Sequence, residues 1–244
     1  MRARVTFLAS VASLVLGLFV NDAQAAEPER PVMTVKATKD FEVTGAGKAK
    51  AWDTVAWTPL SIRPEAAHDY KTQVKMLYSE TGLYLLMDGT DSKLTASFTK
   101  DLEHLWTEDV YEAFFWPDEK LPLYFEYEIS PLNYELPILV PNVDGKFMGW
   151  TPWMYDGGRK TRKAIHITGG KAESGAEIQG WRAEVFFPYE LLRPLGNVPP
   201  KPGSRWRANF YRMDYDGGKR TQWDWSRVGP SFHEFEKFGT LVFE

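Results

Sequence analysis

The chain has 244 residues, a formal net charge of -4 and no cysteine. The acidic charge argues against nucleic acid or an anionic membrane surface as a partner. Without cysteine the protein can carry neither a disulfide bond nor a lipid anchor attached through a cysteine, so its fold must be held by its core alone.

The N-terminal residues have the pattern of a cleavable signal peptide. Arg2 and Arg4 precede a mostly apolar run over residues 5–20, and Ala23 and Ala25 form the small-x-small pattern that a signal peptidase accepts. The apolar run is short, contains polar residues and lacks a basic stop-transfer flank, which argues against a membrane anchor. We therefore expect cleavage after Ala25, a secreted or periplasmic protein, and no membrane contact after cleavage of residues 1–25.

The remaining chain is expected to form one large domain. Residues 26–39 are a polar, proline-containing lead, and residues 40–244 fit one all-β domain better than two small ones. No internal repeat or low-complexity segment interrupts this part of the sequence.

Short runs separated by Gly, Pro, Asn and Asp dominate the sequence, and no long amphipathic helix pattern is present. Strands are predicted at residues 74–78, 83–87, 110–115, 124–129, 181–187, 205–212 and 239–243, one helical turn at residues 189–192, and a long tryptophan-bearing loop or hairpin at residues 142–163. The run at 124–129 alternates most clearly, with apolar residues on one face and Glu126 and Glu128 on the other. This alternation predicts an antiparallel β-sandwich, jelly-roll-like and with immunoglobulin-like layers.

The signatures of the common enzyme classes are absent from the sequence. There is no Gly-rich phosphate loop, no GxSxG elbow, no HExxH and no cysteine nucleophile. A glycosidase needs only two carboxylates at a suitable separation, so Glu108 or Asp109 with Glu112 keeps that alternative open. Because Asp109 and Glu112 would point to opposite faces of a strand, a protein without catalytic residues is favoured.

The histidines do not predict a metal site. His68, His104, His166 and His233 lack the spacing of zinc ligands. A haem can be held by one histidine and a distant methionine or histidine, since such pairs need no local motif. A haem-binding sandwich is therefore a further alternative.

Two segments combine aromatic side chains with carboxylate, amide and guanidinium groups. Aromatic residues make up 15% of the chain, with 10 tryptophans, more than a core of this size needs. Aromatic rings pack on the C–H faces of sugars, and the polar groups bind sugar hydroxyls. Residues 105–112 and 222–234 offer this mixture, and the loop context of Trp106 and Phe232 favours exposure to a ligand.

The same segments resemble family 9 carbohydrate-binding modules. The resemblance is carried, in family order, by residues 77–85, 106–114, 181–188, 203–210 and 233–239, and the second of these has the pattern W-x-x-D-x-x-E-x-F. It spans residues 40–244. It implies a β-sandwich that binds the end of a poly- or oligosaccharide such as xylan or cellulose and assists carbohydrate breakdown or uptake, with a secreted glycoside hydrolase as a candidate partner.

The resemblance also implies site residues. Trp106 and Phe232 are expected to stack a terminal sugar between them, and Glu112, with Asp109 beside it, to accept protons from hydroxyl groups. The supporting contacts are Trp223, Trp225, Asn209 and Arg212. Phe232 stands where sugar-binding members carry tryptophan, and Glu128 where they carry arginine. Some members bind structural calcium, but no complete ligand set is matched here, and relatives with the same sandwich bind haem.

Overall fold

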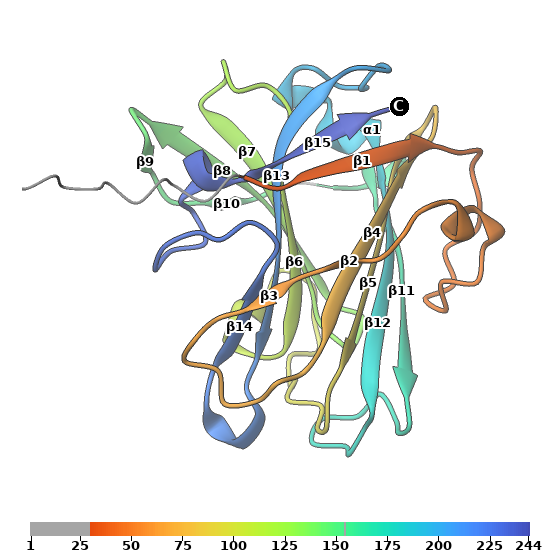
Figure 1. Cartoon of the computed structure of the whole chain (residues 1–244), viewed down its shortest axis with the longest axis vertical. Helices are drawn as coiled ribbons and strands as arrows, with labels where there is room; N and C mark the ends of the chain where they lie inside the picture. Colours follow the sequence, from red (N-terminus) through yellow and green to blue (C-terminus); the bar gives the residue numbers. More distant parts are fainter. Residues whose placement is uncertain (1–29, 154) are drawn as a thin grey trace, which may run out of the picture.

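The computed structural model describes residues 30–153 and 155–244 (Figure 1). The expected signal peptide and its cleavage site lie outside these residues. The strands are β1 (Val32–Ala37), β2 (Thr58–Pro59), β3 (Ser61–Ile62), β4 (Thr72–Tyr78), β5 (Gly82–Thr90), β6 (Val110–Trp116), β7 (Leu123–Ile129), β8 (Glu135–Val143), β9 (Lys146–Phe147), β10 (Thr151–Pro152), β11 (Arg162–Thr168), β12 (Gly180–Pro188), β13 (Arg205–Asp214), β14 (Thr221–Asp224) and β15 (Gly239–Phe243), and the α-helix is α1 (Tyr189–Leu192).

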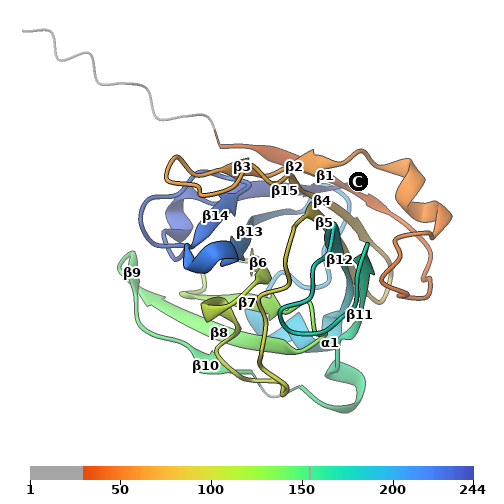
Figure 2. The same cartoon turned by 90° about the horizontal axis from the view of Figure 1, so that it is seen from below.

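Two layers of strands enclose the core. The first layer has the order β10-β8-β7-β6-β13-β15, the second has the order β4-β5-β12-β11, and β1 joins them. Figure 2 shows β1 and β15 along the side where the two layers meet. The predicted β-sandwich is thus confirmed. The pairs of β1 with β15 and β4 are parallel, whereas the other strand pairs of the described residues are antiparallel.

β1 lies in the segment that the sequence assigned to a lead before the domain. Its first half pairs with β15 and its last two residues, Lys36 and Ala37, pair with β4. Met33 and Val35 are buried in the core between the layers. The domain therefore includes this strand, which was missed because only two of its six side chains are buried.

Each strand predicted from alternation is present, and so are the turn of α1 and a hairpin between β8 and β9. Asp144 and Gly145 make that hairpin turn with positive φ values of 48° and 74°. β8 was not predicted because Pro137 and Pro141 resemble strand breakers. β11 was missed because it is an edge strand whose side chains are mostly half-exposed.

Alternation along β6 and β7 gives the first layer two different faces. Phe125 and Tyr127 point into the sandwich core, where Phe187 of the second layer contacts Tyr127 at a ring-centroid distance of 4.8 Å. Glu126 and Glu128 lie on the opposite face, as the sequence predicts. That face is covered by a second buried cluster, which includes Phe235 and other residues of the C-terminal segment.

A segment over residues 38–57 covers the outer face of the second layer. Fully buried Glu184 of β12 accepts hydrogen bonds from Trp52 Nε1 and from the backbone N–H groups of Thr44 and Gly45, each at 2.8 Å. Gly45 has φ +79°, and a Cβ there would lie 2.8 Å from the backbone of Ile165. The buried carboxylate and this close approach fix the segment against the layer.

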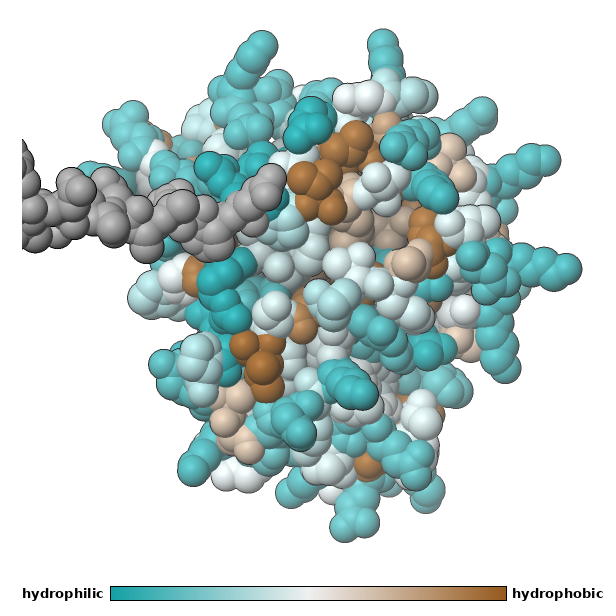
Figure 3. Space-filling view, in the orientation of Figure 1, coloured by the Kyte–Doolittle hydropathy of each residue, from teal (hydrophilic) through white to brown (hydrophobic). Residues whose placement is uncertain are grey.

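Hydrophilic residues cover most of the face shown in Figure 3, with small separate hydrophobic patches. The large hydrophobic residues that are exposed in the described part of the chain are Val32, Leu102, Val143, Phe147, Met148 and Trp150. Several of them fall between residues 143 and 150, next to β9. None of the described helices has the length and apolar character needed to traverse a bilayer.

A buried ionic network lies at one end of the sandwich. Arg212 of β13 is fully buried, and its Nη2 donates to Asp91 Oδ2 at 2.9 Å and to Asp214 Oδ2 at 2.7 Å. Its Nη1 donates to the carbonyl of Thr90 at 2.7 Å. A Cβ at Gly89 would lie 2.7 Å from Arg212 Nη1, so glycine is required for this contact. The network connects the first layer to the end of β5 in the second.

Replacing Arg212 with Met should lower the free energy of unfolding by about 3–5 kcal/mol, because two buried carboxylates lose their cation. Urea unfolding measures this effect. Arg193→Met is the control, because the side chain of Arg193 is 67% exposed and its loss should cost less than about 0.5 kcal/mol. Equal stability of the two variants would contradict a structural role for the network.

Candidate functional site

A pocket of about 350 Å³ opens on the face of the first layer that turns away from the sandwich core. Its polar lining residues are Glu112, Glu126, Glu128, Arg220, Gln222 and His233, and its apolar lining residues are Trp106, Phe114, Ile138, Phe147, Trp150, Met213, Pro230 and Phe232. The strands supply the floor, and loops and the β9 hairpin supply the walls. The pocket therefore combines aromatic walls with a floor rich in carboxyl groups.

Strand register brings the three glutamates of the floor together. Glu112 of β6 is directly opposite Glu128 of β7. Glu126, two residues before Glu128, shares its face and lies between Phe114 of β6 and Ile138 of β8. The carboxyl groups thus occupy neighbouring positions on two adjacent strands.

Burial raises the pKa of each acid in the floor. It raises the pKa of Glu112 from 4.5 to about 8. Burial, followed by the charge of Glu112, raises the pKa of Glu126 well above its usual value, and the charges of Glu112 and Glu126 add to the effect of burial on Glu128. Desolvation and mutual repulsion both favour the neutral acid. Near neutral pH the floor therefore carries protonated carboxyl groups in the absence of a cation.

His233 does not act as that cation. Burial lowers the pKa of His233 from 6.5 to about 4, so the imidazole is neutral near neutral pH. Its Nδ1 is 2.7 Å from the Tyr124 hydroxyl and 3.7 Å from Glu126 Oε2. Met213 also lines the pocket, and its sulfur accepts a hydrogen bond from Tyr215. His233 and Met213 would be the axial ligands of a haem at this pocket. Because each already contacts a tyrosine hydroxyl and the floor is acidic, the residues fit a haem poorly.

Trp106 and Trp150 form an angled aromatic wall. Trp106 lies in the short 3-10 helix Leu105–Thr107, and His104 immediately precedes that helix. The Trp106 and His104 rings stack at a centroid distance of 4.4 Å. The Trp150 ring lies 5.4 Å from Trp106 at an interplanar angle of 77°. Trp150 is 36% exposed, and Phe147, which stacks on His233 at 4.2 Å, is 43% exposed. These exposed rings offer surface to a ligand.

Phe232 lines the pocket, but its ring is not free for the stacking that the sequence predicts. Tyr211 stacks on the Phe232 ring at 4.0 Å with an interplanar angle of 10°. The Arg63 guanidinium lies over the ring at 4.9 Å from its centroid. One face cannot hold both groups, so both faces of Phe232 are covered and a ligand meets its edge. At the pocket the Trp106 ring contacts the Trp150 ring, and Phe232 lines the same pocket.

Asp109 lies outside the pocket lining. Its Oδ2 accepts the backbone N–H of Thr95 at 2.6 Å and its Oδ1 accepts that of Tyr215 at 2.9 Å. Burial, followed by the charges of Asp214 and Asp91, raises the pKa of Asp109 to about 8. Both oxygens are thus engaged in holding two loops, which corrects the expectation that Asp109 stands beside Glu112 at the ligand.

The four expected supporting contacts are also outside the lining. Trp223 donates from Nε1 to the carbonyl of Tyr70, and Trp225 packs on Phe210 in the core. Asn209 donates to the Tyr211 hydroxyl and the carbonyl of Ser226 and accepts from two backbone N–H groups. Arg212 belongs to the ionic network. Because their polar groups are used inside the protein, Trp223, Trp225, Asn209 and Arg212 serve the fold.

Sequence reasoning missed four of the residues that shape the pocket. Glu126 was placed on the correct face without a role in the site, and Glu128 was noted only where sugar-binding members of the family carry arginine. Phe147 and Trp150 fell in the tryptophan-bearing segment that was predicted as a loop or hairpin, without an assigned role. The available signal was two aromatic residues beside the Asp-Gly turn of an exposed hairpin.

The first group of residues that could hold a metal ion is Asp91, Asp109 and Asp214. All three are buried, and Arg212 already donates to Asp91 and Asp214. Asp109 accepts its two backbone hydrogen bonds. The guanidinium occupies the place of a cation, so these residues fit structural calcium poorly.

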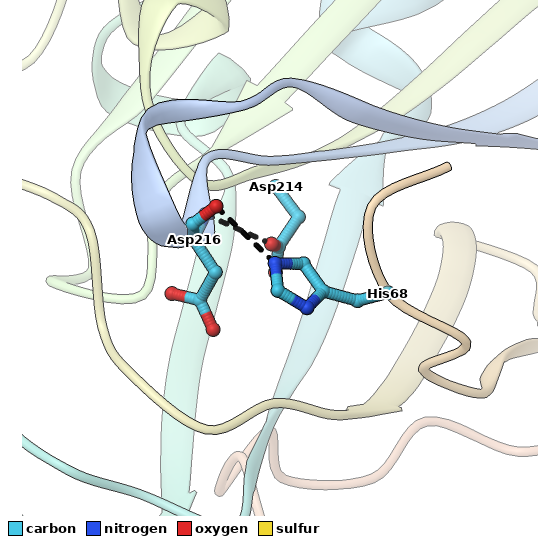
Figure 4. Close-up of side chains that lie close together, drawn as sticks. All are labelled: His68, Asp214 and Asp216. Atoms are coloured by element: carbon cyan, nitrogen blue, oxygen red, sulfur yellow. Dashed lines mark hydrogen bonds between the residues drawn. The ribbon is translucent and has the colours of Figure 1, made fainter. Parts of the chain in front are cut away.

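The second such group is His68, Asp214 and Asp216 (Figure 4). His68 Nε2 is 3.2 Å from the carbonyl oxygen of Asp216, and Asp214 Oδ1 accepts the Asp216 N–H at 3.1 Å. Asp216 Oδ1 is buried and has no hydrogen-bond partner among the described residues. Calcium prefers six to eight oxygen ligands. One free carboxylate oxygen beside an imidazole does not supply that set.

Comparison with known proteins agrees with this architecture. Residues 43–138 match the model of the carbohydrate family 9 binding domain-like family. A crystal structure of a candidate carbohydrate-binding protein from Bacteroides uniformis superposes with a TM-score of 0.72 at 16% identity and covers 88% of this chain and 100% of that one. This match and the shared fold confirm the resemblance to a family 9 carbohydrate-binding-like domain that the ordered motifs predict.

Two further relatives are similar along most of their length. A family 9 carbohydrate-binding module from Caldicellulosiruptor kristjanssonii in complex with cellotriose has a TM-score of 0.62 at 13% identity, with 88% of this chain and 94% of that chain covered. A protein from Arthroderma benhamiae named "Extracellular protein" is 27% identical over 219 residues, which are 82% of this chain and 95% of that protein.

The raised pKa of Glu112 predicts a pH effect on stability. Between pH 4.5 and about 8 the folded protein holds a proton that the unfolded chain has lost, so this contribution to stability is complete below 4.5 and is lost as the pH rises through about 8. In Glu112→Gln the loss with pH should be smaller by up to about 1.4 kcal/mol per pH unit.

Urea unfolding at several pH values within this window measures the effect. Glu80→Gln, at an exposed position, is the control and should follow the wild type. A parallel pH dependence of Glu112→Gln and wild type would show that the acid is ionised in the folded protein.

Proposed function

We propose that this protein binds the end of a poly- or oligosaccharide in the pocket and does not cleave it. The observation that carries the proposal is the angled pair of Trp106 and Trp150 above a floor of buried carboxyl groups. A pyranose presents apolar C–H faces to aromatic rings and hydroxyl groups to polar atoms. Glu112 and Gln222 lie in the lining, where they can bind those hydroxyls.

Trp106 is the main stacking residue of the proposal. His104 covers one of its faces at 4.4 Å, which stabilises the ring and leaves the opposite side for the ligand. Trp150 approaches at a steep angle, so it closes one side of the pocket. Phe232 contributes an edge, since its faces are covered. The Caldicellulosiruptor kristjanssonii modules in complex with cellotriose and glucose support a sugar as the ligand class.

The protein is further proposed to be exported and to work beside a secreted glycoside hydrolase. Its N-terminal pattern and the name of the Arthroderma benhamiae relative support export. Residues 32–244 are proposed as the domain, because β1 belongs to the sandwich. The pocket is open and presents no catalytic pair, which suits a module that holds polysaccharide ends in breakdown or uptake.

Calorimetric titration with cello-, xylo- and manno-oligosaccharides, with and without calcium, tests the binding function. Trp106→Ala should weaken saturable sugar binding by about 1–3 kcal/mol without unfolding the protein. Trp150→Ala should have the same direction. Trp57→Ala is the matched control, since Trp57 is half-buried outside the pocket and packs against Lys75. Saturable binding that is unchanged in both pocket variants would show that the sugar binds elsewhere on the protein.

Hydrolysis of an O-glycosidic bond is a second candidate function, favoured by the three carboxyl groups at one pocket. A glycosidase needs one protonated and one ionised carboxyl, and enzymes separate the two pKa values through different environments. Here burial raises the pKa of Glu112, Glu126 and Glu128 in the same direction. The arrangement therefore lacks an ionised partner.

A panel of xylan, cellulose and mannan is expected to yield no reducing sugar on incubation with the protein, because no ionised carboxylate faces the neutral acids. The assay is sensitive to trace activity when run at high protein concentration. Release of reducing sugar that disappears in Glu112→Gln would overturn the non-catalytic assignment.

A further inference from the structure

The floor of the pocket contains more acid than a neutral sugar requires. Glu112, Glu126 and Glu128 are 2%, 5% and 1% exposed, and they share one face of β6 and β7. Acidic side chains are almost never this buried unless a cation or a set of hydrogen bonds compensates them. The free protein thus holds three carboxyl groups away from water, where their attraction to a positive charge is strongest.

The side chains of Glu126 and Glu128 hydrogen-bond to each other, and each still has one buried oxygen atom that no N–H group of the described residues reaches. Glu126 Oε2 and Glu128 Oε2 are buried, line the pocket and lack a hydrogen-bond partner among residues 30–153 and 155–244. Glu126 Oε2 lies 3.7 Å from His233 Nδ1, which is too long for a hydrogen bond. That nitrogen lies 2.7 Å from the Tyr124 hydroxyl instead. The unsatisfied oxygens therefore point to a donor supplied by a ligand.

The described lining residues do not place a cation on the floor. Arg220 carries a permanent charge, but it is exposed and its side chain interacts with Tyr215. His233 is neutral near neutral pH because burial lowers its pKa to about 4. Among the ion pairs of the described residues, the one that involves a floor glutamate joins Glu126 to His233 and not to Arg220. Apart from Arg220, which lines the same pocket, a positive charge at the floor near neutral pH must come from a ligand.

The walls suit the same ligand. Trp106, Trp150 and Phe147 present aromatic rings to the pocket. The negative face of an aromatic ring attracts a nearby cation, and the attraction grows when both are shielded from water. An ammonium group above the carboxyls is thus compatible with rings at its sides. A neutral hydroxyl group at the same place would form a hydrogen bond with a carboxyl group but would lack the attraction between a cation and the aromatic rings.

We propose that the pocket is selective for an amino sugar, a hexosamine whose ring packs on Trp106 and Trp150 and whose free ammonium group donates to Glu126 and Glu128. The inference rests on the proposed function, since it names the sugar class of the same pocket. Ammonium donates three hydrogen bonds, which matches two carboxyl groups with unfilled acceptor positions. Charge-assisted bonds of this kind are stronger than neutral ones.

Binding of the ammonium also changes the protonation of the floor. The carboxyl O–H bond breaks, the proton leaves to solvent, and the resulting carboxylate pairs with the ammonium, which keeps its own protons. The raised pKa values of the three acids mean that this proton is present in the free protein near neutral pH. Amino sugar binding is therefore expected to release a proton, whereas binding of a neutral sugar is not.

Calorimetry near neutral pH with the fully deacetylated glucosamine trisaccharide, its N-acetylated form, cellotriose and choline tests the proposal. The glucosamine trisaccharide should bind about tenfold or more tightly than each of the other three. Titrations in buffers of different ionisation enthalpy should reveal proton release for this ligand alone. E126Q/E128Q should remove the preference for the amine and the proton release, and Glu80→Gln should behave as wild type.

The outcomes separate this inference from the proposed function. If cellotriose or the N-acetylated trisaccharide binds as tightly as the free amine, and Trp106→Ala abolishes that binding, the pocket binds sugars and the amino sugar assignment is wrong. If choline matches the amino sugar while cellotriose does not bind, the pocket is a general ammonium site. If no sugar binds, the proposed function itself is wrong. The ligand series on the wild type decides these cases even if E126Q/E128Q does not fold.

Discussion

Burial of the first layer on both faces is the constraint on which the rest of the structure depends. One face of β6 and β7 packs into the sandwich core, and the other is covered by the C-terminal segment around Phe235. Any polar side chain in these strands is therefore removed from water. This desolvation shifts the pKa of Glu112, and it requires the hydrogen bonds that hold Asp109 and Asn209. The pocket is the place where the cover is incomplete.

The sequence predicts the sandwich well because alternation with a period of two survives in each strand whose faces differ. The run 124–129 shows this, since its apolar and acidic residues occupy opposite faces in the structure. The pattern cannot report an edge strand such as β11, because its side chains are mostly half-exposed and burial differs little between its two faces. It also misses β1, whose place between the layers depends on contacts with residues more than two hundred positions away.

The site was harder to predict than the fold because residue type does not reveal which loop covers which strand. Trp106, Glu112 and Phe232 do meet at one pocket, although they come from different parts of the chain. The ring of Phe232 looked available because it lies in a loop, but Tyr211 and Arg63 cover it from both sides. Arg212 resembled a ligand contact and is instead the cation of a buried network. Such differences arise from long-range packing.

The parallel pairing of β1 with β15 affects how the molecule responds to a mechanical load. The start of β1 and the end of β15 lie at opposite ends of the shared ladder, which joins Val32 to Thr240 and Val35 to Phe243. Tension between the two ends of the chain therefore acts along this ladder and loads its hydrogen bonds together, rather than opening them one at a time. β1 passes the load to the second layer through β4. A domain built in this way resists extension between the start of β1 and the end of β15.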